Sequence, residues 1–287
     1  MSDELVLGTR GSALALAQSG QVAARLTAAT GVPVRLQIVR TRGDDVQDRS
    51  LAEIGGKGLF TAELESALRD GGIDFAVHSL KDLPTDDPAG LVIGAVPLRE
   101  DPRDVLVGFD LASLPAGARV GTGSLRRRFQ LAQHRPDVVV AAIRGNIDTR
   151  LRRRDEGRYD AIILAMAGLR RLGVQRADIH PLDPTLMIPA VGQGALGVQA
   201  RSGDRRVLDL LAALHHPPTA RCVAAERSYL RAWGGGCNVP VGAHATLDGD
   251  MILLRATVED ERGIALAEAS GSDPERLGAE LARQMRE

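Results

Sequence analysis

The sequence has 287 residues, enough for two or three domains of about 100–150 residues each. Its 44% hydrophobic and 25% charged residues are ordinary for a globular protein. No segment reaches the roughly 18–20 apolar residues of a membrane-spanning helix, and residues 1–7 lack the basic start of a secretory signal. The net charge of −1 gives no overall attraction to nucleic acid or membrane. We expect a cytoplasmic protein whose two cysteines, Cys222 and Cys237, are reduced.

The first third of the chain alternates strand and helix patterns. Short apolar runs alternate with segments whose apolar residues recur at helical spacing. Strands are predicted at residues 5–9, 34–39, 73–77 and 91–96, and helices at residues 13–29 and 60–68. Ser12 is the expected N-cap of the first helix. A series of this kind predicts a mainly parallel sheet with helices on both faces.

The middle of the chain repeats this alternation and predicts a second α/β domain, with residues 97–102 as the crossover. Strands are expected at 119–121, 138–142 and 161–165, and helices at 124–134, 147–154 and from 168 onward.

The region after residue 191 differs. A strand at 195–200 and helices at 205–214 and 219–233 precede two strands, 239–247 and 251–258, and a final helix, 274–286. The turn Asp248-Gly249-Asp250 between the two strands indicates a hairpin. These elements predict a small α+β third domain.

Positive charge is concentrated in the middle of the chain. Residues 119–176 contain fourteen arginines, no lysine and five acidic residues. A coding bias toward arginine explains most of this imbalance, since lysine occurs only at Lys57 and Lys81. It does not explain why both lysines lie in glycine- or turn-flanked segments, GGKGLF and HSLKDLP.

Three arginine-bearing segments each follow a predicted strand and open a helix: RGS (10–12), GTGSLRRR (121–128) and IRGNIDTR (143–150). Arg170 and Arg171 follow the next strand in the same way. Helix N-termini and guanidinium groups both bind anions, and ligands of open α/β sheets lie at the carboxyl ends of strands. The alternatives are capped turns with surface arginines, or a helix that faces nucleic acid or forms salt bridges.

The RRR run of the second segment favours a ligand site. Cations in the first turn of a helix oppose the helix dipole and one another, at some tenths of a kcal/mol each. An anionic ligand would resolve this conflict.

Two further segments carry reactive groups. Asp82 follows a buried strand beside Lys81, and a carboxylate near arginines should stay ionised and could stabilise a cation or move protons. His78 is interpreted as a packed strand residue. Cys237 lies in the loop GGGCNVP, where glycines permit an exposed thiol and a covalent role. Cys222, in an apolar helix, is expected in the core.

Together these segments resemble the porphobilinogen deaminase (hydroxymethylbilane synthase) family. The resemblance covers nearly the whole chain, in family order. It is carried by GTRGSALALAQ (8–18), TRGD (41–44), GGKGLFTAELE (55–65), AVHSLKDLPT (76–85), REDPRD (99–104), GTGSLRRRFQL (121–131), IRGNIDTRL (143–151), AIILAMAGLRRLG (161–173), PAVGQGALG (189–197) and GGCNVPVGA (235–243).

The resemblance implies a transferase of tetrapyrrole (haem) biosynthesis. It would condense four porphobilinogen molecules head to tail into hydroxymethylbilane with release of ammonia. A dipyrromethane cofactor, the primer, would be attached to Cys237 through a thioether. Asp82 would be the catalytic residue, stabilising positive pyrrole nitrogens and helping to move protons. No metal is implied.

The resemblance also assigns the binding residues. Every pyrrole carries acetate and propionate groups, so the growing chain accumulates carboxylates that need bidentate donors. The cofactor is assigned Lys81, Thr122, Ser124, Arg126, Arg127, Arg144 and Gly145. The incoming substrate is assigned Arg10, Ser12, Arg150 and Arg171, with Arg144 shared between the two. Lys57 and Phe60 match a loop that would cover the site.

The family fold consists of two type II periplasmic-binding-protein-like α/β domains and a small C-terminal α+β domain that carries the cysteine. The implied domains are residues 1–97 with 194–214, residues 98–193, and residues 215–287. Three positions depart from the family pattern: Glu53 replaces the common lysine, Gly123 a serine and Gly234 a glutamate. We expect a monomer that binds a small molecule and neither nucleic acid nor membrane.

Other functions remain open at this point. A non-catalytic solute-binding module would explain the two α/β domains and the arginines, but not the cysteine in its glycine loop. A nucleic-acid-binding protein could use the arginines of 126–154, yet aromatic residues, at 2%, offer little base stacking. A transferase with a cysteine nucleophile would need a histidine partner, and no histidine is evident beside Cys237.

Overall fold

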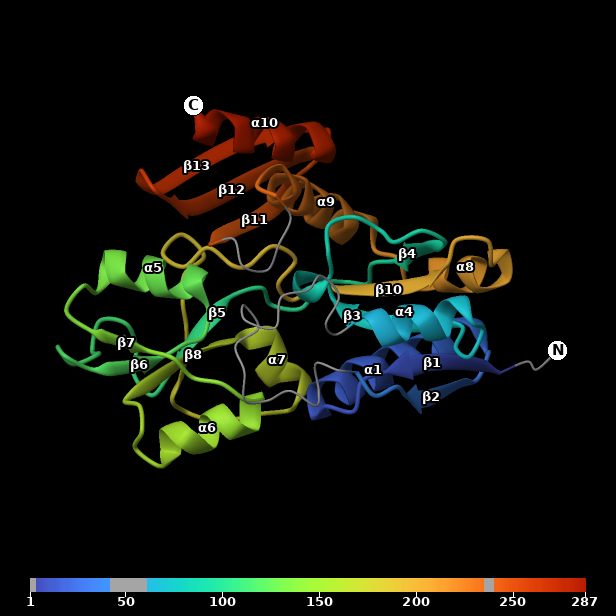
Figure 1. Ribbon diagram of the computed structural model, residues 1–287, viewed down its shortest axis with the longest axis horizontal. Coiled ribbons are helices and arrows are strands. Elements are labelled where there is room, and N and C mark those ends of the chain that lie inside the picture. Colours follow the sequence, from blue (N-terminus) through green and yellow to red (C-terminus); the bar gives the residue numbers. More distant parts are fainter. Residues whose placement is uncertain (1–3, 42–60, 235–239) are drawn as a thin grey trace. The chain divides into compact units, whose positions relative to one another are not determined.

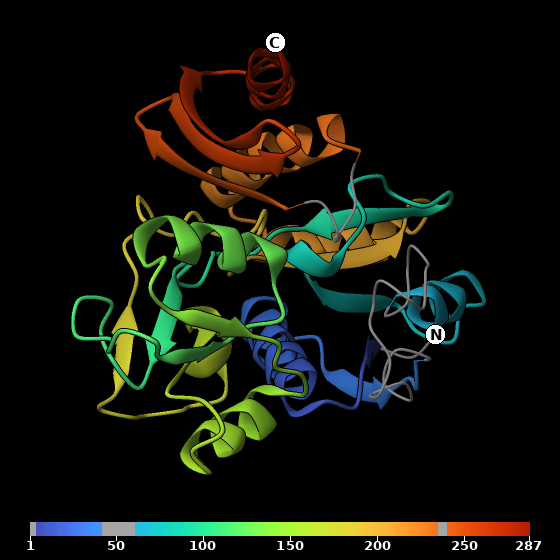
Figure 2. The same cartoon turned by 60° about the vertical axis from the view of Figure 1, so that its left-hand side comes forward.

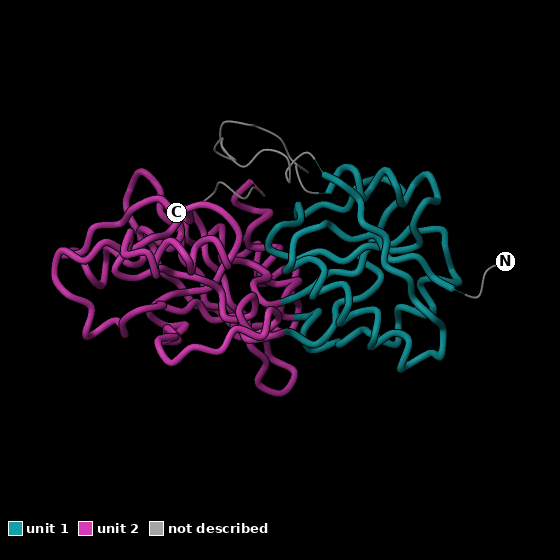
Figure 3. The backbone as a smooth tube through the Cα atoms, turned by 90° about the horizontal axis from the view of Figure 1, so that it is seen from below, with its two compact units in different colours: residues 1–99, 195–221 teal, residues 100–194, 222–287 magenta. Residues whose placement is uncertain are grey.

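The computed structural model describes residues 4–41, 61–234 and 240–287. The chain forms two compact units (Figure 3). Unit 1 comprises Met1–Arg99 and Ala195–Arg221, and unit 2 comprises Glu100–Gly194 and Cys222–Glu287. No helix in the described ranges is long and apolar enough to cross a membrane.

Unit 1 contains a five-stranded sheet (Figure 1). Its strands, in spatial order, are β2 (Val34–Ile38), β1 (Leu5–Thr9), β3 (Phe75–Ser79), β10 (Leu196–Arg201) and β4 (Leu91–Ala95). β1 pairs in parallel with β2 and β3, whereas β10 is antiparallel to β3 and β4. The carboxyl ends of β1 and β3 therefore meet at the same edge as the amino end of β10.

Helices cover both faces of this sheet. They are α1 (Ala13–Thr30), α4 (Ala62–Arg69) and α8 (Arg205–Leu211), with short 3₁₀ helices η1 (Leu80–Asp82) and η2 (Ala212–Leu214). Leu26 of α1 and Val207 of α8 share a buried cluster with Phe75, whereas Leu64 of α4 clusters with Ala76. Successive residues of β3 thus face opposite helices, as the two-residue period of a strand requires.

Helix α1 has the start and stop signals that its sequence predicts. The Ser12 side chain accepts a hydrogen bond from the Ala15 N–H, and Gly31 ends the helix with a left-handed φ of 74°. Both groups satisfy backbone atoms that a helix end leaves unpaired. The Ser12 cap therefore fixes where the chain turns from β1 into the helix.

Unit 2 contains a second five-stranded sheet of the same kind. Its strands, in spatial order, are β7 (Val139–Ala141), β6 (Arg119–Gly121), β8 (Ala161–Ala165), β5 (Asp104–Val107) and β9 (Ile179–Pro181). β6 is parallel to β7 and β8, and β5 is antiparallel to β8 and β9. The amino end of β5 thus lies at the edge where β6, β7 and β8 have their carboxyl ends.

The helices of this part are α5 (Leu125–His134), α6 (Ile147–Asp155) and α7 (Met166–Arg171). Leu131 of α5 packs in one buried cluster with Val120 of β6, while Leu151 of α6 and Leu169 of α7 pack in another with Ile162 of β8. Helices again cover both faces of the sheet.

The C-terminal part of unit 2 is an antiparallel sheet with helices on one side (Figure 2). Its elements are α9 (Pro217–Ala232), β11 (Val241–Asp248), β12 (Met251–Asp260), β13 (Gly263–Gly271) and α10 (Pro274–Arg286). Asp248 pairs with Met251, which confirms the predicted hairpin. Tyr229 of α9, Leu254 of β12 and Leu281 of α10 share one core, which also contains Cys222. The core assignment of Cys222 is thereby confirmed.

The structure confirms the fold class, two α/β sheets with a small C-terminal α+β part. The sequence missed β5, β9 and β13 and predicted more parallel pairing than exists, since β10 and β5 run antiparallel. The division into three domains stays a prediction, since the chain clusters into two units and the C-terminal sheet belongs to the second.

Two helical glycines allow a test of the α9–α10 packing. A Cβ on Gly278 of α10 would meet the backbone of α9, 2.6 Å from the Tyr229 nitrogen, whereas a Cβ on Gly20 of α1 would meet nothing within 4 Å. Because backbone cannot move aside, we expect Gly278→Ala to destabilise the fold by about 1–3 kcal/mol. Gly20→Ala should be neutral or stabilising by up to about 1 kcal/mol. Denaturant unfolding checks both, and equal midpoints for the two variants would contradict the packing.

Candidate active site

Four predicted site residues lie at the carboxyl edge of the unit 1 sheet. Arg10 and Ser12 follow β1, and Lys81 and Asp82 follow β3, the neighbouring parallel strand. Asp82 is exposed, while Arg10, Ser12 and Lys81 are half-buried. The structure thus brings these four residues to one edge, as the sequence predicted.

Buried leucines on either side of Lys81 and Asp82 hold Asp82 at the surface. Leu80 is 1% exposed, and its backbone N–H donates to the Ala195 carbonyl at 3.1 Å. A Cβ on Gly197 would lie 2.8 Å from the Leu80 side chain, so glycine in β10 makes room for this anchor. With Leu80 and Leu83 both buried, the short helix between them projects Lys81 and Asp82 outward.

His78 lies in β3 with 7% of its surface exposed. Burial, with the Arg10 charge adding to it, lowers the pKa of His78 to about 4. Its Nε2 atom is buried and has no hydrogen-bond partner in the described part of the chain. The histidine is therefore neutral at pH 7 and packed, as the sequence indicated.

The carboxyl edge of the unit 2 sheet carries the second group. Thr122 and Ser124 follow β6, Arg144 and Gly145 follow β7, and Arg171 follows β8 in α7. Ser124 caps α5, since its Oγ accepts from the Arg127 N–H, and its own N–H donates to Thr122 Oγ1 at 3.2 Å. The three strands are neighbours and parallel, so these segments share one edge.

Arg126 and Arg127 are buried, with 5% and 6% of their surface exposed, and both contact Asp104. Arg127 donates from Nε at 3.1 Å and from Nη2 at 2.7 Å to Asp104 Oδ1, and from Nη1 to the Ile163 carbonyl at 2.9 Å. Arg126 Nη1 lies 2.7 Å from Asp104 Oδ2 and donates to the Ile188 carbonyl at 2.6 Å. We call Asp104, Arg126 and Arg127 the charge cluster.

The charge cluster holds two positive charges and one negative charge. Burial would raise the pKa of Asp104, but the charges of Arg126 and Arg127 outweigh burial and hold it well below its usual range. Burial lowers the pKa of Arg126. Arg126 Nε is buried and lacks a hydrogen-bond partner among the residues described. Among the residues that the structure describes, the cluster is therefore a buried site with a net charge of +1.

Asp104 also changes the interpretation of the RRR run. The sequence favoured an external anion as the partner of all three arginines. Arg128 is exposed, and Asp104 already neutralises one of the other two charges. Asp104 was not among the predicted site residues, although it ends the segment REDPRD (99–104) that carries the family resemblance.

Gly145 and Arg150 interact directly. Gly145 has a left-handed φ of 102°, and Arg150 Nε donates to its carbonyl at 2.7 Å. Burial, with the neighbouring Arg127 charge, lowers the pKa of Arg150 to about 10. Arg144 is exposed, and its carbonyl accepts from Arg153 Nη1 at 3.0 Å. Arg150 thus adds a further positive charge near the charge cluster.

Arg171 contacts the turn that precedes β10. Its Nη2 donates to the Gly194 carbonyl at 2.7 Å. The adjacent Arg170 forms ion pairs with Glu100 at 2.9 Å and Asp101 at 3.1 Å. Arg171 is thus held in place by backbone, and Arg170 by acids of the crossover segment.

Three predicted residues, Lys57, Phe60 and Cys237, lie outside the described residues. In the ranges that the structure covers, no group of three or more histidine, cysteine or acidic side chains could hold a metal ion.

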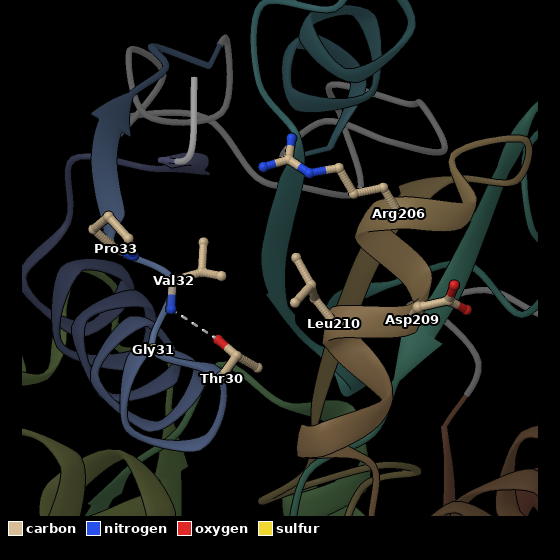
Figure 4. Close-up of a pocket in the computed structure, with 7 residues that line it drawn as sticks. All are labelled: Thr30, Gly31, Val32, Pro33, Arg206, Asp209 and Leu210. Atoms are coloured by element: carbon tan, nitrogen blue, oxygen red, sulfur yellow. Dashed lines mark hydrogen bonds between the residues drawn. The ribbon is translucent and has the colours of Figure 1, made fainter. Parts of the chain in front are cut away.

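A hollow of about 670 Å³ lies elsewhere (Figure 4). It is lined by Thr30, Gly31, Val32, Pro33, Arg206, Asp209 and Leu210. Residues 30–33 connect the end of α1 to the start of β2, so the hollow lies at the sheet edge opposite Arg10 and Asp82. Its single arginine and single acid do not suit a ligand with many carboxylates.

Comparison with known proteins matches the chain to two family models. They are described as "Porphobilinogen deaminase, dipyromethane cofactor binding domain", over residues 5–209, and "Porphobilinogen deaminase, C-terminal domain", over residues 220–287.

Curated relatives match over nearly their full length. The porphobilinogen deaminase of Roseiflexus castenholzii is 50% identical and covers 99% of this chain and 96% of the relative. That of Moorella thermoacetica is 51% identical and covers 98% of this chain and 93% of the relative. Among solved structures, the methionine-binding protein MetQ aligns with a TM-score of 0.45 at 12% identity, covering 78% of this chain and 95% of that one.

The neutral state of His78 predicts a pH dependence of stability. Between about pH 6.5 and pH 4 the unfolded chain binds a proton at this histidine and the folded chain does not, so stability should fall as the pH falls through this window. From pH 7 to pH 4 we expect the wild type to lose about 2–3 kcal/mol more than His78→Gln. Unfolding midpoints at both pH values measure this difference. His180→Gln, at a half-buried position in β9, is the control and should lose as much stability as the wild type. If the wild type and His78→Gln lost equal stability between the two pH values, the neutral state of His78 would be contradicted.

Proposed function

Since the chain belongs to the porphobilinogen deaminase family, we propose that its arginine-bearing strand ends hold the acidic groups of substrate and primer, with Asp82 at the reacting centre. The chain is a transferase of tetrapyrrole biosynthesis. It condenses four porphobilinogen molecules head to tail into hydroxymethylbilane and releases ammonia. Its cofactor is dipyrromethane, and we propose Cys237 as the residue to which the cofactor is attached.

The charge cluster is the observation that carries the proposed binding site. A buried, uncompensated guanidinium costs several kcal/mol unless an anion accompanies it. Asp104 supplies one negative charge for two arginines, and Arg150 increases the positive charge nearby. A carboxylate of the primer would supply the missing charge. The donor set of the site therefore fits dipyrromethane, whose side chains end in carboxylates.

Four further residues assigned to the cofactor lie at the same edge of the unit 2 sheet as the charge cluster. Thr122 and Ser124 begin α5, where backbone N–H groups and the helix dipole favour an anion. Arg144 and Gly145 follow the neighbouring strand, and we assign all four residues to the cofactor. Lys81, at the carboxyl edge of the unit 1 sheet, is also assigned to the cofactor, as a cation for primer carboxylates.

Arg10, Ser12, Arg150 and Arg171 are assigned to the incoming substrate. Arg150 uses Nε to hold Gly145, and Arg171 uses one Nη2 hydrogen to hold Gly194. A guanidinium has five N–H groups, so one backbone bond does not prevent it from donating to a carboxylate as well. Their backbone bonds orient these donors before a substrate binds, which lowers the entropic cost of binding.

Asp82 is the proposed catalytic residue. When bound, the dipyrromethane supplies the pyrrole carbon to which the first new unit is joined. Asp82 is exposed on η1 and held there by buried Leu80, so its carboxylate can face a positively charged pyrrole nitrogen or accept a proton. Lys57 and Phe60 are proposed as parts of a covering loop.

The alternative, a non-catalytic binding module, is not favoured. Both family models that match this chain describe an enzyme, and together they span nearly all of it. We further propose that the protein works as a cytoplasmic monomer, without nucleic acid or membrane partners.

Intact mass measurement tests the attachment and the role of Asp82 together. The purified wild type should carry a covalent adduct beyond its sequence mass, and Cys237→Ser should lack it. Asp82→Asn should keep the adduct but lose about 100-fold or more in turnover, because it removes the charge that stabilises the cationic state.

Asp87→Asn is the matched control, since Asp87 is also exposed and follows the same turn. Its adduct and turnover should equal those of the wild type. Normal turnover in Asp82→Asn would refute the role of Asp82, and an adduct that persists in Cys237→Ser would refute the attachment site.

A further inference from the structure

Asp104 is fully buried at the centre of the charge cluster, and the assignments above give it no part in the reaction. It is the first residue of β5, which pairs antiparallel with β8, so Asp104 lies opposite Ala165, the last residue of β8. The amino end of β5 thus places the Asp104 carboxylate at the edge of the sheet where the parallel strands β6, β7 and β8 are followed by arginines.

Asp104 fixes the plane of the Arg127 guanidinium by hydrogen bonds and holds Arg126 beside it by charge. Arg127 is held through Nε and Nη2 by Asp104 Oδ1 and through Nη1 by the Ile163 carbonyl. Arg126 is held through Nη1, between Asp104 Oδ2 and the Ile188 carbonyl. The Arg127 guanidinium, bound through three nitrogens, cannot rotate, so its other N–H groups have a fixed direction. Arg126 is placed through Nη1 alone, since Asp104 Oδ2 has no hydrogen-bond partner in the described part of the chain.

The orientation of Asp104 is itself determined. Gln193 Nε2 donates to Asp104 Oδ1 at 2.9 Å and to the Pro102 carbonyl at 2.7 Å. Oδ1 therefore accepts from both Arg127 and Gln193, and Oδ2 faces Arg126. The three hydrogen bonds to Oδ1 fix the orientation of the carboxylate, which is the condition for a group that orients others.

We propose that Asp104 is a positioning residue for the cofactor-binding arginines. It fixes the remaining N–H groups of Arg127 in the direction of a ligand carboxylate, and it holds Arg126 beside them by charge. It also neutralises one of the two positive charges, so that both arginines can be buried together. This inference rests on the proposed function, in which these arginines hold primer carboxylates.

Two effects of removing the Asp104 charge have opposite signs. Without that charge the cluster gains one net positive charge, so electrostatics alone would strengthen the binding of an anionic cofactor. An amide in place of the carboxylate keeps one acceptor oxygen and replaces the other by a donor. The anchor of Arg127 then becomes weaker and Arg126 loses its counter-charge, so the geometry would weaken binding. The direction of the change therefore distinguishes positioning from charge balance.

The test is Asp104→Asn, which keeps the shape of the side chain and removes its charge. Intact mass gives the fraction of purified molecules that carry the adduct, and steady-state kinetics give kcat per adduct-bearing molecule and KM for porphobilinogen. We expect the adduct-bearing fraction to fall at least about fivefold and kcat about tenfold, with KM within about twofold of the wild type. A general loosening of the fold would raise KM as well.

Asp178→Asn is the matched control. Asp178 is also shared by two arginines, Arg154 and Arg176, each at 2.9 Å, but it is partly exposed and has no place in the proposed site. Its adduct fraction and kcat should equal those of the wild type. Equal losses in both variants, or an undiminished adduct fraction in Asp104→Asn, would overturn the proposal. A wild type without any adduct would instead contradict the proposed function.

If Asp104→Asn does not accumulate as folded protein, a second pair of variants distinguishes positioning from charge balance. Arg126→Gln is compared with Arg126→Gln/Asp104→Asn, in which one positive charge remains. Electrostatics alone predicts more adduct in the double variant, because it has lost a negative charge. We expect at least about threefold less, since a neutral amide holds Arg127 less firmly than the carboxylate does. An equal or larger adduct fraction in the double variant would overturn the proposal.

Discussion

One buried carboxylate opposite two buried guanidinium groups determines the character of the binding site. Asp104 allows Arg126 and Arg127 to leave water, and it leaves the cluster, among the described residues, with a net charge of +1. A charge in such surroundings is stable only with an anion beside it. The low dielectric that makes the unpaired charge costly also makes its attraction for a ligand carboxylate strong. The chain thus uses part of its stability to prepare a site for an acidic molecule.

The mixed strand directions of the two sheets bring the site residues to the same edges. In unit 2 the parallel strands β6, β7 and β8 end in segments that carry arginine, and antiparallel β5 begins there with Asp104. Antiparallel β10 likewise begins at the carboxyl edge of the unit 1 sheet, next to the anchor of Leu80. Purely parallel sheets would offer only carboxyl ends at such an edge. In unit 2, antiparallel β5 adds Asp104 as the counter-charge of the arginines. In unit 1, the turn before antiparallel β10 supports the short helix that carries Asp82.

Much of this arrangement could be predicted from the sequence. The Ser12 and Ser124 caps, the strand-end arginines and the packed state of His78 follow from local patterns. Asp104 could not be found in this way, because β5 is short, follows proline and lies at the site through its amino end. Helical spacing also could not separate buried Arg126 and Arg127 from exposed Arg128. Their partner belongs to another strand, and only the pairing of β5 with β8 brings it close.

A crystal structure of the purified, adduct-bearing protein would test the central claim most directly. The quantity to measure is the distance from the guanidinium nitrogens of Arg126 and Arg127 to the nearest primer carboxylate oxygen. The account predicts at least one contact within about 3.2 Å, with Asp104 still bound to both arginines. A primer whose carboxylates all lie elsewhere, with Asp104 as the sole anion at these arginines, would contradict it.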